Sequence, residues 1–214
     1  MSLFNRKQDW LPVPEPRTGM TKFIVACDLH IGSKYQDNDN AVYELEELKN
    51  DGFTVLNGDL VDRSACKRKD VEFFTIYMNE LIKKFGAYYI MGNHERNGIK
   101  YEPLIITTEN MMRVGFAHGD LISNYEKWSK YRQKPLGASW LGLIIVDIFD
   151  DLDHLKAMRP LPKEFLPNAV KYCRTYSLDY LVCGHFHVEA ERRYYVDGKV
   201  IIILPAHRIN EVWI

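Results

Sequence analysis

The sequence predicts a single-domain α/β fold. Three apolar, β-rich segments, residues 22–30, 53–59 and 87–95, alternate with two amphipathic segments, residues 40–52 and 69–86. Strands that alternate with helices in this way pair in parallel and form a layered α/β sheet. The length of 214 residues suits one domain that buries enough apolar surface to fold without a disulfide or a metal.

The two amphipathic segments are predicted to be helices because of their apolar spacing and their stop signals. Apolar residues recur at helical spacing and so share one face of each helix. They are Val42, Leu45 and Leu48 in the first segment and Val71, Phe74, Met78, Leu81 and Phe85 in the second. The first segment ends in Asn-Asp-Gly and the second in glycine, which are residues that terminate helices.

The second half of the chain changes pattern and is predicted to be more antiparallel. Strand-like runs at residues 102–110 and 111–120 precede a long, mostly helical stretch at residues 123–176. Further strands are expected at residues 178–183, 191–195, 200–204 and 211–214, with an Asp-Gly hairpin turn at residues 197–198. Residues 1–20 are rich in proline and are expected to form an irregular N-terminal arm, which leaves residues 21–214 as the domain.

Composition narrows the classes of function. The net charge of −1 gives no basic excess, which weighs against a nucleic-acid partner. The cysteines form no C-x-x-C pair and are interpreted as reduced thiols of a cytoplasmic protein: Cys27, Cys66, Cys173 and Cys183. The most apolar window, Trp140–Phe149, is far shorter than the ~20 residues of a membrane-spanning helix. This window is buried core, a substrate lid or an oligomer interface; peripheral membrane contact and oligomeric state stay open.

Polar side chains follow the ends of five predicted strands. The segments are Asp28-Leu29-His30, Gly58-Asp59-Leu60-Val61-Asp62, Gly92-Asn93-His94-Glu95, His118-Gly119-Asp120 and Gly184-His185-Phe186-His187. Ligands of open α/β sheets bind outside the carboxyl ends of the strands, so these side chains form one polar site if the strand ends converge. Alternation along an extended segment would let Asp28 and His30 face the same side, and likewise His185 and His187.

Seven of these positions are candidate metal ligands. They are Asp28, His30, Asp59, Asn93, His118, His185 and His187. Imidazole, carboxylate and amide ligands are typical of sites for Mn, Fe, Zn or Co, and they differ from the ligands of a thiolate metal site. Seven protein ligands are too many for one catalytic ion that must keep a position open. They predict two ions that share a bridging carboxylate, for which Asp59 is the natural choice.

These five motifs, in this order, resemble the calcineurin-like metallophosphoesterase superfamily, whose pattern is D-x-H, G-D-x-x-D, G-N-H-[DE], H and G-H-x-H. The resemblance implies a four-layer α/β/β/α sandwich of two mixed sheets, with the site at the strand ends. It also implies a ligand set for each ion: Asp28, His30, Asp59 and His187 for one, and Asp59, Asn93, His118 and His185 for the other.

The same resemblance implies a hydrolase that cleaves a phosphoester or phosphoanhydride with two divalent metal ions and a metal-bridging hydroxide. Manganese is the first choice of metal, with Fe, Zn, Co and Ni as alternatives. His94 would be the general acid or transition-state donor, oriented by Asp62, or would only make a structural hydrogen bond to Asp62. Arg63 would contact a phosphate oxygen or form a surface ion pair.

Two branches of the superfamily share features with the chain. G-D-L-V-D-R and G-N-H-E are similar to the Ser/Thr protein phosphatases, but Ser64, Met91 and His187 depart from that branch. H-G-D and G-H-x-H, with a helical insertion between them, look more like the UDP-diacylglucosamine pyrophosphohydrolases, in which the insertion caps the site. This predicts a helical cap at residues 123–176, after His118, and a small, nucleotide-linked or lipid-linked substrate. Protein phosphatase, phosphodiesterase or nuclease activity, or a non-catalytic scaffold, are the alternatives.

Two features outside the motifs are candidates for substrate contact. His207 follows the predicted strand at residues 200–204, near the expected catalytic edge. The segment Lys127–Lys134 mixes aromatic and basic side chains, which bind phosphorylated or nucleotide ligands, with a solvated helix as the alternative interpretation.

Overall fold

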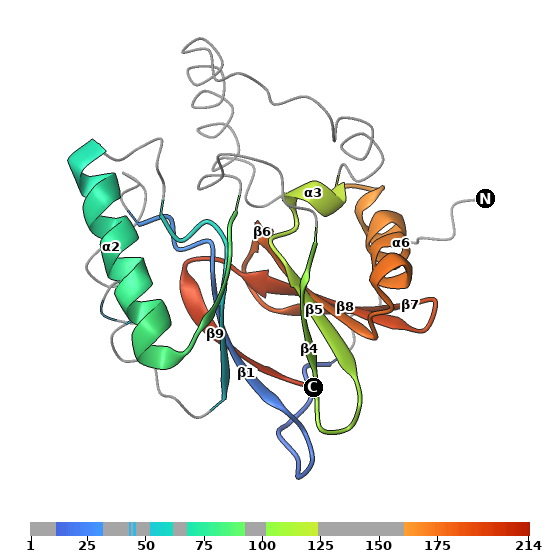
Figure 1. Ribbon diagram of the computed structural model, residues 1–214. Helices are drawn as coiled ribbons and strands as arrows, with labels where there is room; N and C mark the ends of the chain where they lie inside the picture. Colours follow the sequence, from blue (N-terminus) through green and yellow to red (C-terminus); the bar gives the residue numbers. More distant parts are fainter. Residues whose placement is uncertain are drawn as a thin grey trace.

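Figure 1 shows the chain as a computed structural model. The structure describes residues 12–31, 43, 45, 52–61, 68–92, 102–123 and 161–214. Its strands are β1 Lys22–Cys27, β2 Phe53–Asn57, β3 Tyr88–Ile90, β4 Leu104–Thr107, β5 Arg113–Ala117, β6 Tyr180–Val188, β7 Arg192–Val196, β8 Lys199–Pro205 and β9 Arg208–Trp213. Its helices are α2 Arg68–Phe85, α3 Asp120–Ser123 and α6 Phe165–Tyr176.

The strands form two mixed sheets. The first has the order β3-β2-β1-β9, in which β1, β2 and β3 run parallel and β9 runs antiparallel to β1. The second has the order β4-β5-β6-β8-β7, in which β5, β6 and β8 run parallel and both edge strands run antiparallel to their neighbours. In Figure 1, α2 lies outside the first sheet and α6 outside the second. The early β-α-β-α-β pattern therefore built a parallel sheet, as predicted.

The two sheets enclose a central apolar core. Side chains alternate along β1 and β2, so Phe23, Val25 and Val55 point to the same face and are fully buried. They belong to one cluster with Val114 and Phe116 of β5, and the rings of Phe23 and Phe116 lie 5.2 Å apart. This core holds the two sheets in a fixed relation, and the strand ends that carry the polar motifs are fixed with them.

Helix α2 covers the outer face of the first sheet. Ile24 and Leu56, which alternate with the residues of the central core, are buried in a second cluster with Met78 of this helix. Phe85 in its last turn packs partly buried against the same cluster. The helix ends at Gly86, whose φ of 59° is readily adopted only by glycine. The predicted helix and its stop signal are therefore confirmed.

Helix α6 covers the outer face of the second sheet and completes the α/β/β/α order. Phe165, Ala169 and Cys173, which share one face of the helix, are buried with Leu181 of β6 and Ile203 of β8. The sequence assigned residues 165–176 to a helical cap, but here they form an outer layer of the sandwich. The rest of that expected cap, residues 124–160, lies outside the described residues.

The first five predicted strands are present with shorter bounds, and β7 is shifted by one residue. Three later strands extend beyond their predicted bounds: β6 continues to Val188, whereas the sequence predicted its end at Cys183, and β8 and β9 are also longer than expected. Of the predicted helix at residues 40–52, Tyr43, Leu45 and Gly52 are described; the first two are helical and Gly52 lies in a bend before β2. Residues 12–20 contain no helix or strand, and Trp140–Phe149 lies outside the described part of the chain. No helix among the described residues has the length and apolarity needed to cross a membrane.

Removal of the Phe116 ring should destabilise the sandwich without touching the polar edge. Phe116 is fully buried between the sheets, so Phe116→Ala is expected to lower the free energy of unfolding by ~3–5 kcal/mol. Tyr195→Ala is the matched control, because that ring is 64% exposed, and it should change stability by about 0.5 kcal/mol or less. Urea unfolding measures both; equal losses would show that the central core does not carry the fold.

Candidate metal centre

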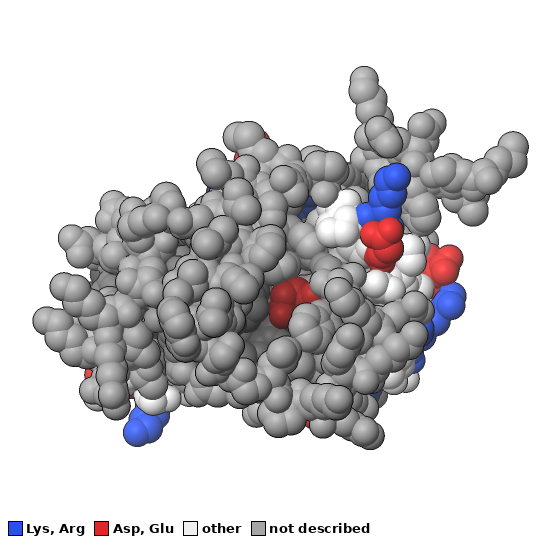
Figure 2. All heavy atoms as spheres, turned by 90° about the horizontal axis from the view of Figure 1, so that it is seen from above, with Lys and Arg blue, Asp and Glu red and all other residues white. Residues whose placement is uncertain are grey.

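Two buried aspartates lie just past the carboxyl ends of neighbouring parallel strands. Asp28 follows β1 and Asp59 follows β2, and they expose 0% and 1% of their surface. The backbone N–H of Asp28 donates to the carbonyl of Gly58 at 3.0 Å, and that of His30 donates to the carbonyl of Asp59 at 2.9 Å. These bonds continue the pairing of β1 and β2 into the polar turns. Figure 2, seen from above this edge, shows acidic atoms inside a hollow near the middle of the face.

One cluster of potential ligands consists of Asp28, His30 and His187. One ligand atom from each lies within 4.8 Å of the others. The Nε2 atoms of His30 and His187 are 3.2 Å apart, and Nε2 of His187 lies 3.7 Å from Oδ1 of Asp28. Two imidazole nitrogens and a carboxylate oxygen therefore point at a common position, as the ligands of one cation would.

A second cluster consists of Asp59, His118 and His185, with the same 4.8 Å limit between ligand atoms. Nε2 of His118 lies 2.8 Å from Oδ2 of Asp59, and the rings of His118 and His185 pack edge to face with centroids 5.1 Å apart. Nε2 of His118 is also 3.9 Å from Oδ1 of Asp28. This last distance joins the two clusters, which therefore lie next to each other.

The backbone at this edge is unusual. Six of the nine described non-glycine residues with positive φ belong to it: Asp28, His30, Asp59, His185, His187 and His207. Their φ angles lie between 45° and 71°. Left-handed backbone is unfavourable for residues that carry a Cβ, and it persists where the surrounding structure enforces it, typically at functional sites. Its concentration here marks the edge independently of the residue types.

The segment Gly184–His187 is a bulge within β6 rather than a turn after it. The pairing of β6 with β8 shifts register in this segment. His185 and His187 have φ angles of 71° and 45°, so they do not alternate along an extended segment, and the prediction that they would is wrong. The bulge instead sends His187 to the cluster of Asp28 and His185 to the cluster of Asp59. Four residues of β6 lie opposite one residue of β8 here, and extra residues in a strand re-aim side chains in this way next to functional sites.

Two glycines make room for the carboxylates. A Cβ on Gly184 would overlap Oδ2 of Asp28, and a Cβ on Gly92 would overlap Oδ1 and the backbone of Asp59. Because Gly184 lets the chain come this close to Asp28, the backbone N–H of His185 can donate to both carboxylate oxygens of Asp28 at 2.9 Å. The glycines of the motifs therefore position the aspartates as well as allowing turns.

The buried carboxylates set the charge of the centre. Burial raises the pKa of Asp28 to about 7, with nearby His118 opposing this and Asp59 adding to it. For His118, burial by itself lowers the pKa, but the Asp59 carboxylate at 2.8 Å outweighs burial and raises the pKa to about 10. The pair of carboxylates thus favours a positive charge between them, which is what a bound metal cation supplies.

The structure brings six of the seven predicted ligands together, in two clusters of three. Asn93 lies outside the described residues, as do the predicted catalytic residues His94, Asp62 and Arg63. His207, singled out only by its position after a strand, lies beside the first cluster: its ring centroid is 5.0 Å from that of His187. The segment Lys127–Lys134 is outside the described residues.

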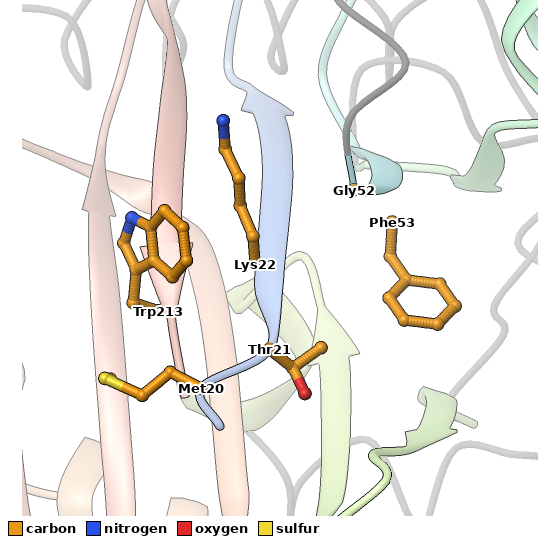
Figure 3. A pocket seen from close by; sticks show the side chains of 6 residues that line it. All are labelled: Met20, Thr21, Lys22, Gly52, Phe53 and Trp213. Carbon is orange, nitrogen blue, oxygen red and sulfur yellow. The ribbon is translucent and has the colours of Figure 1, made fainter. Parts of the chain in front are cut away.

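A separate pocket of about 530 Å³ lies at the other end of β1 (Figure 3). Its lining is Met20, Thr21, Lys22, Gly52, Phe53 and Trp213. The Lys22 ammonium pairs with the carboxylate of Glu211 at 2.8 Å and lies 5.7 Å from the centre of the Trp213 ring. The lining offers aromatic surface and one engaged cation, so its chemistry differs from that of the metal centre.

The sequence pattern of the calcineurin-like phosphoesterases matches residues 21–189. Two curated relatives come from Helicobacter pylori, and each is called an uncharacterized metallophosphoesterase. The protein of strain J99 is 27% identical over 181 residues, which are 78% of this chain and 44% of that protein. The protein of strain 26695 is 36% identical over 99 residues, which are 44% of this chain and 25% of that protein. The chain therefore spans less than half the length of either relative.

Solved structures with a similar arrangement are more distant in sequence. A predicted phosphoesterase from Streptococcus pneumoniae is 10% identical, with a TM-score of 0.44, and the match covers 89% of this chain and 75% of that one. Vacuolar protein sorting 29 from Entamoeba histolytica, solved in complex with Zn²⁺, is 14% identical, with a TM-score of 0.41, and the match covers 87% and 74% of the two chains.

Gly184→Ala should disturb metal binding while the fold persists. The added methyl group would displace the Asp28 carboxylate, and loss of such positioning weakens metal affinity by about 10–100-fold. Gly86→Ala is the control, because an added Cβ there meets nothing within 4 Å and its φ of 59° strains only the local backbone. Calorimetric titration with Mn²⁺ and thermal unfolding compare the two. Unchanged Mn²⁺ affinity in Gly184→Ala would exclude Asp28 as a ligand.

Proposed function

This chain belongs to the calcineurin-like phosphoesterase family, and from that premise we propose that it hydrolyses a phosphoester or phosphoanhydride bond with two divalent metal ions. The observation that carries the proposal is the pair of adjacent clusters, each with one carboxylate and two imidazoles within 4.8 Å of one another. Two neighbouring cations can clamp the attacking and leaving sides of an in-line displacement at phosphorus.

The donors of the clusters suit such ions. Carboxylate oxygens and imidazole nitrogens together favour Mn, Fe, Zn or Co, and we propose manganese as the first metal to test. Asp28, His30 and His187 would hold one ion, and His118 and His185 the other. Asp59 would contribute to both, in keeping with its contact to His118 and with the 3.9 Å that separate His118 from Asp28. When bound, the ions activate water and offset the charge of the phosphate oxygens.

The protein's own groups orient these ligands. The N–H of His185 fixes the carboxylate of Asp28 by donating to both of its oxygens. Nδ1 of His118 lies 3.3 Å from the carbonyl oxygen of Asn57, so as a donor it would turn Nε2 toward Asp59. Hydrogen bonds of this kind set the tautomer and ring orientation of ligating histidines. The ligands are therefore held in place before an ion arrives.

The remaining roles follow from the resemblance of the motifs. Asn93 would complete the second ligand set, His94 would donate a proton to the leaving group, Asp62 would orient His94, and Arg63 would hold a phosphate oxygen. Two described residues support these assignments, because they directly precede Asn93 and Asp62 in the sequence and lie at this edge. Gly92 approaches Asp59, and Val61 forms an isolated β-bridge with Ile31.

For the substrate we propose a phosphorylated small molecule, a nucleotide-linked molecule or a lipid-linked molecule. The support is the position of the insertion after the His118 motif, which matches the capped branch of the superfamily. A screen of phosphomonoesters, phosphodiesters and nucleoside-diphosphate derivatives with Mn²⁺ tests this choice. Turnover confined to phosphoproteins or to nucleic acids would replace it with the protein phosphatase or the nuclease alternative.

Asp59→Asn should abolish hydrolysis of p-nitrophenyl phosphate and of its bis ester. The substitution removes the proposed bridge between the ions, whose charge stabilisation is worth several kcal/mol, so kcat should fall by about 100-fold or more. Asp197→Asn is the control, because that carboxylate is exposed and pairs with Arg174 on the surface. Equal turnover in wild type and Asp59→Asn would contradict the two-ion proposal.

His94→Ala should slow turnover and keep the metal. A positioned proton donor contributes about 10²–10⁴-fold to rate, whereas metal content should stay at the wild-type value. Steady-state kinetics and elemental analysis of the same sample measure the two quantities. Loss of metal together with activity would assign His94 to the ligand set instead.

A further inference from the structure

We propose that His207 binds the phosphate group of the substrate at the metal centre. This inference rests on the proposed function and adds a binding residue that the sequence motifs do not contain. Its basis is where the fold places His207, how firmly the fold holds it there, and which groups surround its ring.

The fold brings His207 to the centre by a crossing between the sheets. β8 of the second sheet ends at Pro205, and β9 of the first sheet begins at Arg208. The two residues between them, Ala206 and His207, span the sandwich at its polar edge. Because β9 pairs with β1, the backbone N–H of His207 donates to the carbonyl oxygen of Asp28 at 3.2 Å.

The ring of His207 lies beside the first cluster without joining it. Its centroid is 5.0 Å from the ring of His187 and 5.8 Å from that of His30. The group of ligand atoms within 4.8 Å of one another contains His30, His187 and Asp28 but not His207. An imidazole that borders this group of ligand atoms without belonging to it is suited to contact what a bound ion holds rather than the ion itself.

The crossing is firmly held. The side-chain nitrogen Nδ2 of buried Asn210 lies 3.2 Å from the carbonyl oxygens of both Pro205 and Arg208. These two residues lie on either side of the crossing. The same nitrogen is also 3.4 Å from the carbonyl oxygen of Val25 in β1. Such contacts bind the crossing to both sheets, so the backbone that carries His207 is held in place before the substrate arrives.

The crossing also carries strain that a glycine would relieve. His207 has a φ of 60°, a conformation in which glycine avoids the steric penalty of a Cβ. A histidine at such a position, next to the first ligand cluster, points to a function of its side chain there. The anion expected at this edge is the phosphate of the substrate, and an imidazole N–H donates to a phosphate oxygen in either ring tautomer.

Binding of inorganic phosphate to the full chain loaded with Mn²⁺ tests the proposal. His207→Gly should weaken phosphate binding by ~10-fold or more, the scale of one hydrogen bond to a charged group, and raise KM for p-nitrophenyl phosphate. Manganese content should stay at the wild-type value, and the melting temperature should not fall. Met111→Gly is the matched control, because Met111 has a φ of 61° and lies in the β4–β5 turn, at the far end of β5.

Further outcomes separate the possible roles of His207. His207→Asn, which tolerates the same φ and keeps an N–H donor, should restore part of the phosphate affinity. Unchanged phosphate affinity in His207→Gly, or loss of manganese from it, would overturn the proposal, the second by making His207 a metal ligand. The melting temperature of His207→Gly could fall further than that of Met111→Gly, and His207→Asn could fail to restore phosphate affinity. That result would show that the imidazole ring only packs against its neighbours and does not bind phosphate. A wild-type protein that neither binds phosphate nor hydrolyses any ester would instead refute the proposed function itself.

Discussion

Two carboxylates buried at the ends of neighbouring parallel strands are the constraint on which the structure of this edge depends. A buried carboxylate is costly unless charged or polar partners surround it. Asp28 and Asp59 obtain such partners from a backbone N–H of the β6 bulge and from the imidazole of His118. The left-handed turns and the closely approaching glycines are the local means of bringing these partners within reach. Backbone strain and carboxylate burial are thus two aspects of one arrangement.

Each cluster draws its members from both sheets. The first combines residues that follow β1 with a residue of the β6 bulge, and the second combines the end of β2 with the end of β5 and the same bulge. The relative placement of the sheets therefore decides the distances between the ligands. The apolar core that contains Phe23 and Phe116 sets that placement, so the precision of the polar edge derives from apolar packing some distance away.

The general site was predictable from sequence because two regularities combine. Apolar periodicity locates the strands, and the carboxyl ends of parallel strands converge at one edge, so the polar residues after β1, β2 and β5 had to meet. The bulge in β6 was not predictable, because left-handed backbone at His185 and His187 is enforced by tertiary contacts that no local pattern reveals. The role of α6 was mistaken for similar reasons, since an amphipathic helix packs equally well on a sheet or over a site.

The position of His207 illustrates the same limit at longer range. Its closeness to Asp28 depends on the pairing of β9 with β1, segments separated by nearly the whole described chain. Local sequence around His207 contains no sign of that pairing. Only the topology shows that a loop between two late strands passes beside the first motif.

The pairing of β1 with β9 has a consequence for biosynthesis. Lys22 at the start of β1 pairs with Trp213 near the end of β9. One edge of β1 therefore has no hydrogen-bonding partner until almost all the described chain has left the ribosome. An unpaired strand edge is a template for association with other chains, and contacts so far apart in sequence form slowly. Until β9 emerges, that edge of β1 is therefore open to association with other chains. Chains that stop short of β9 should aggregate instead of accumulating as partly active fragments.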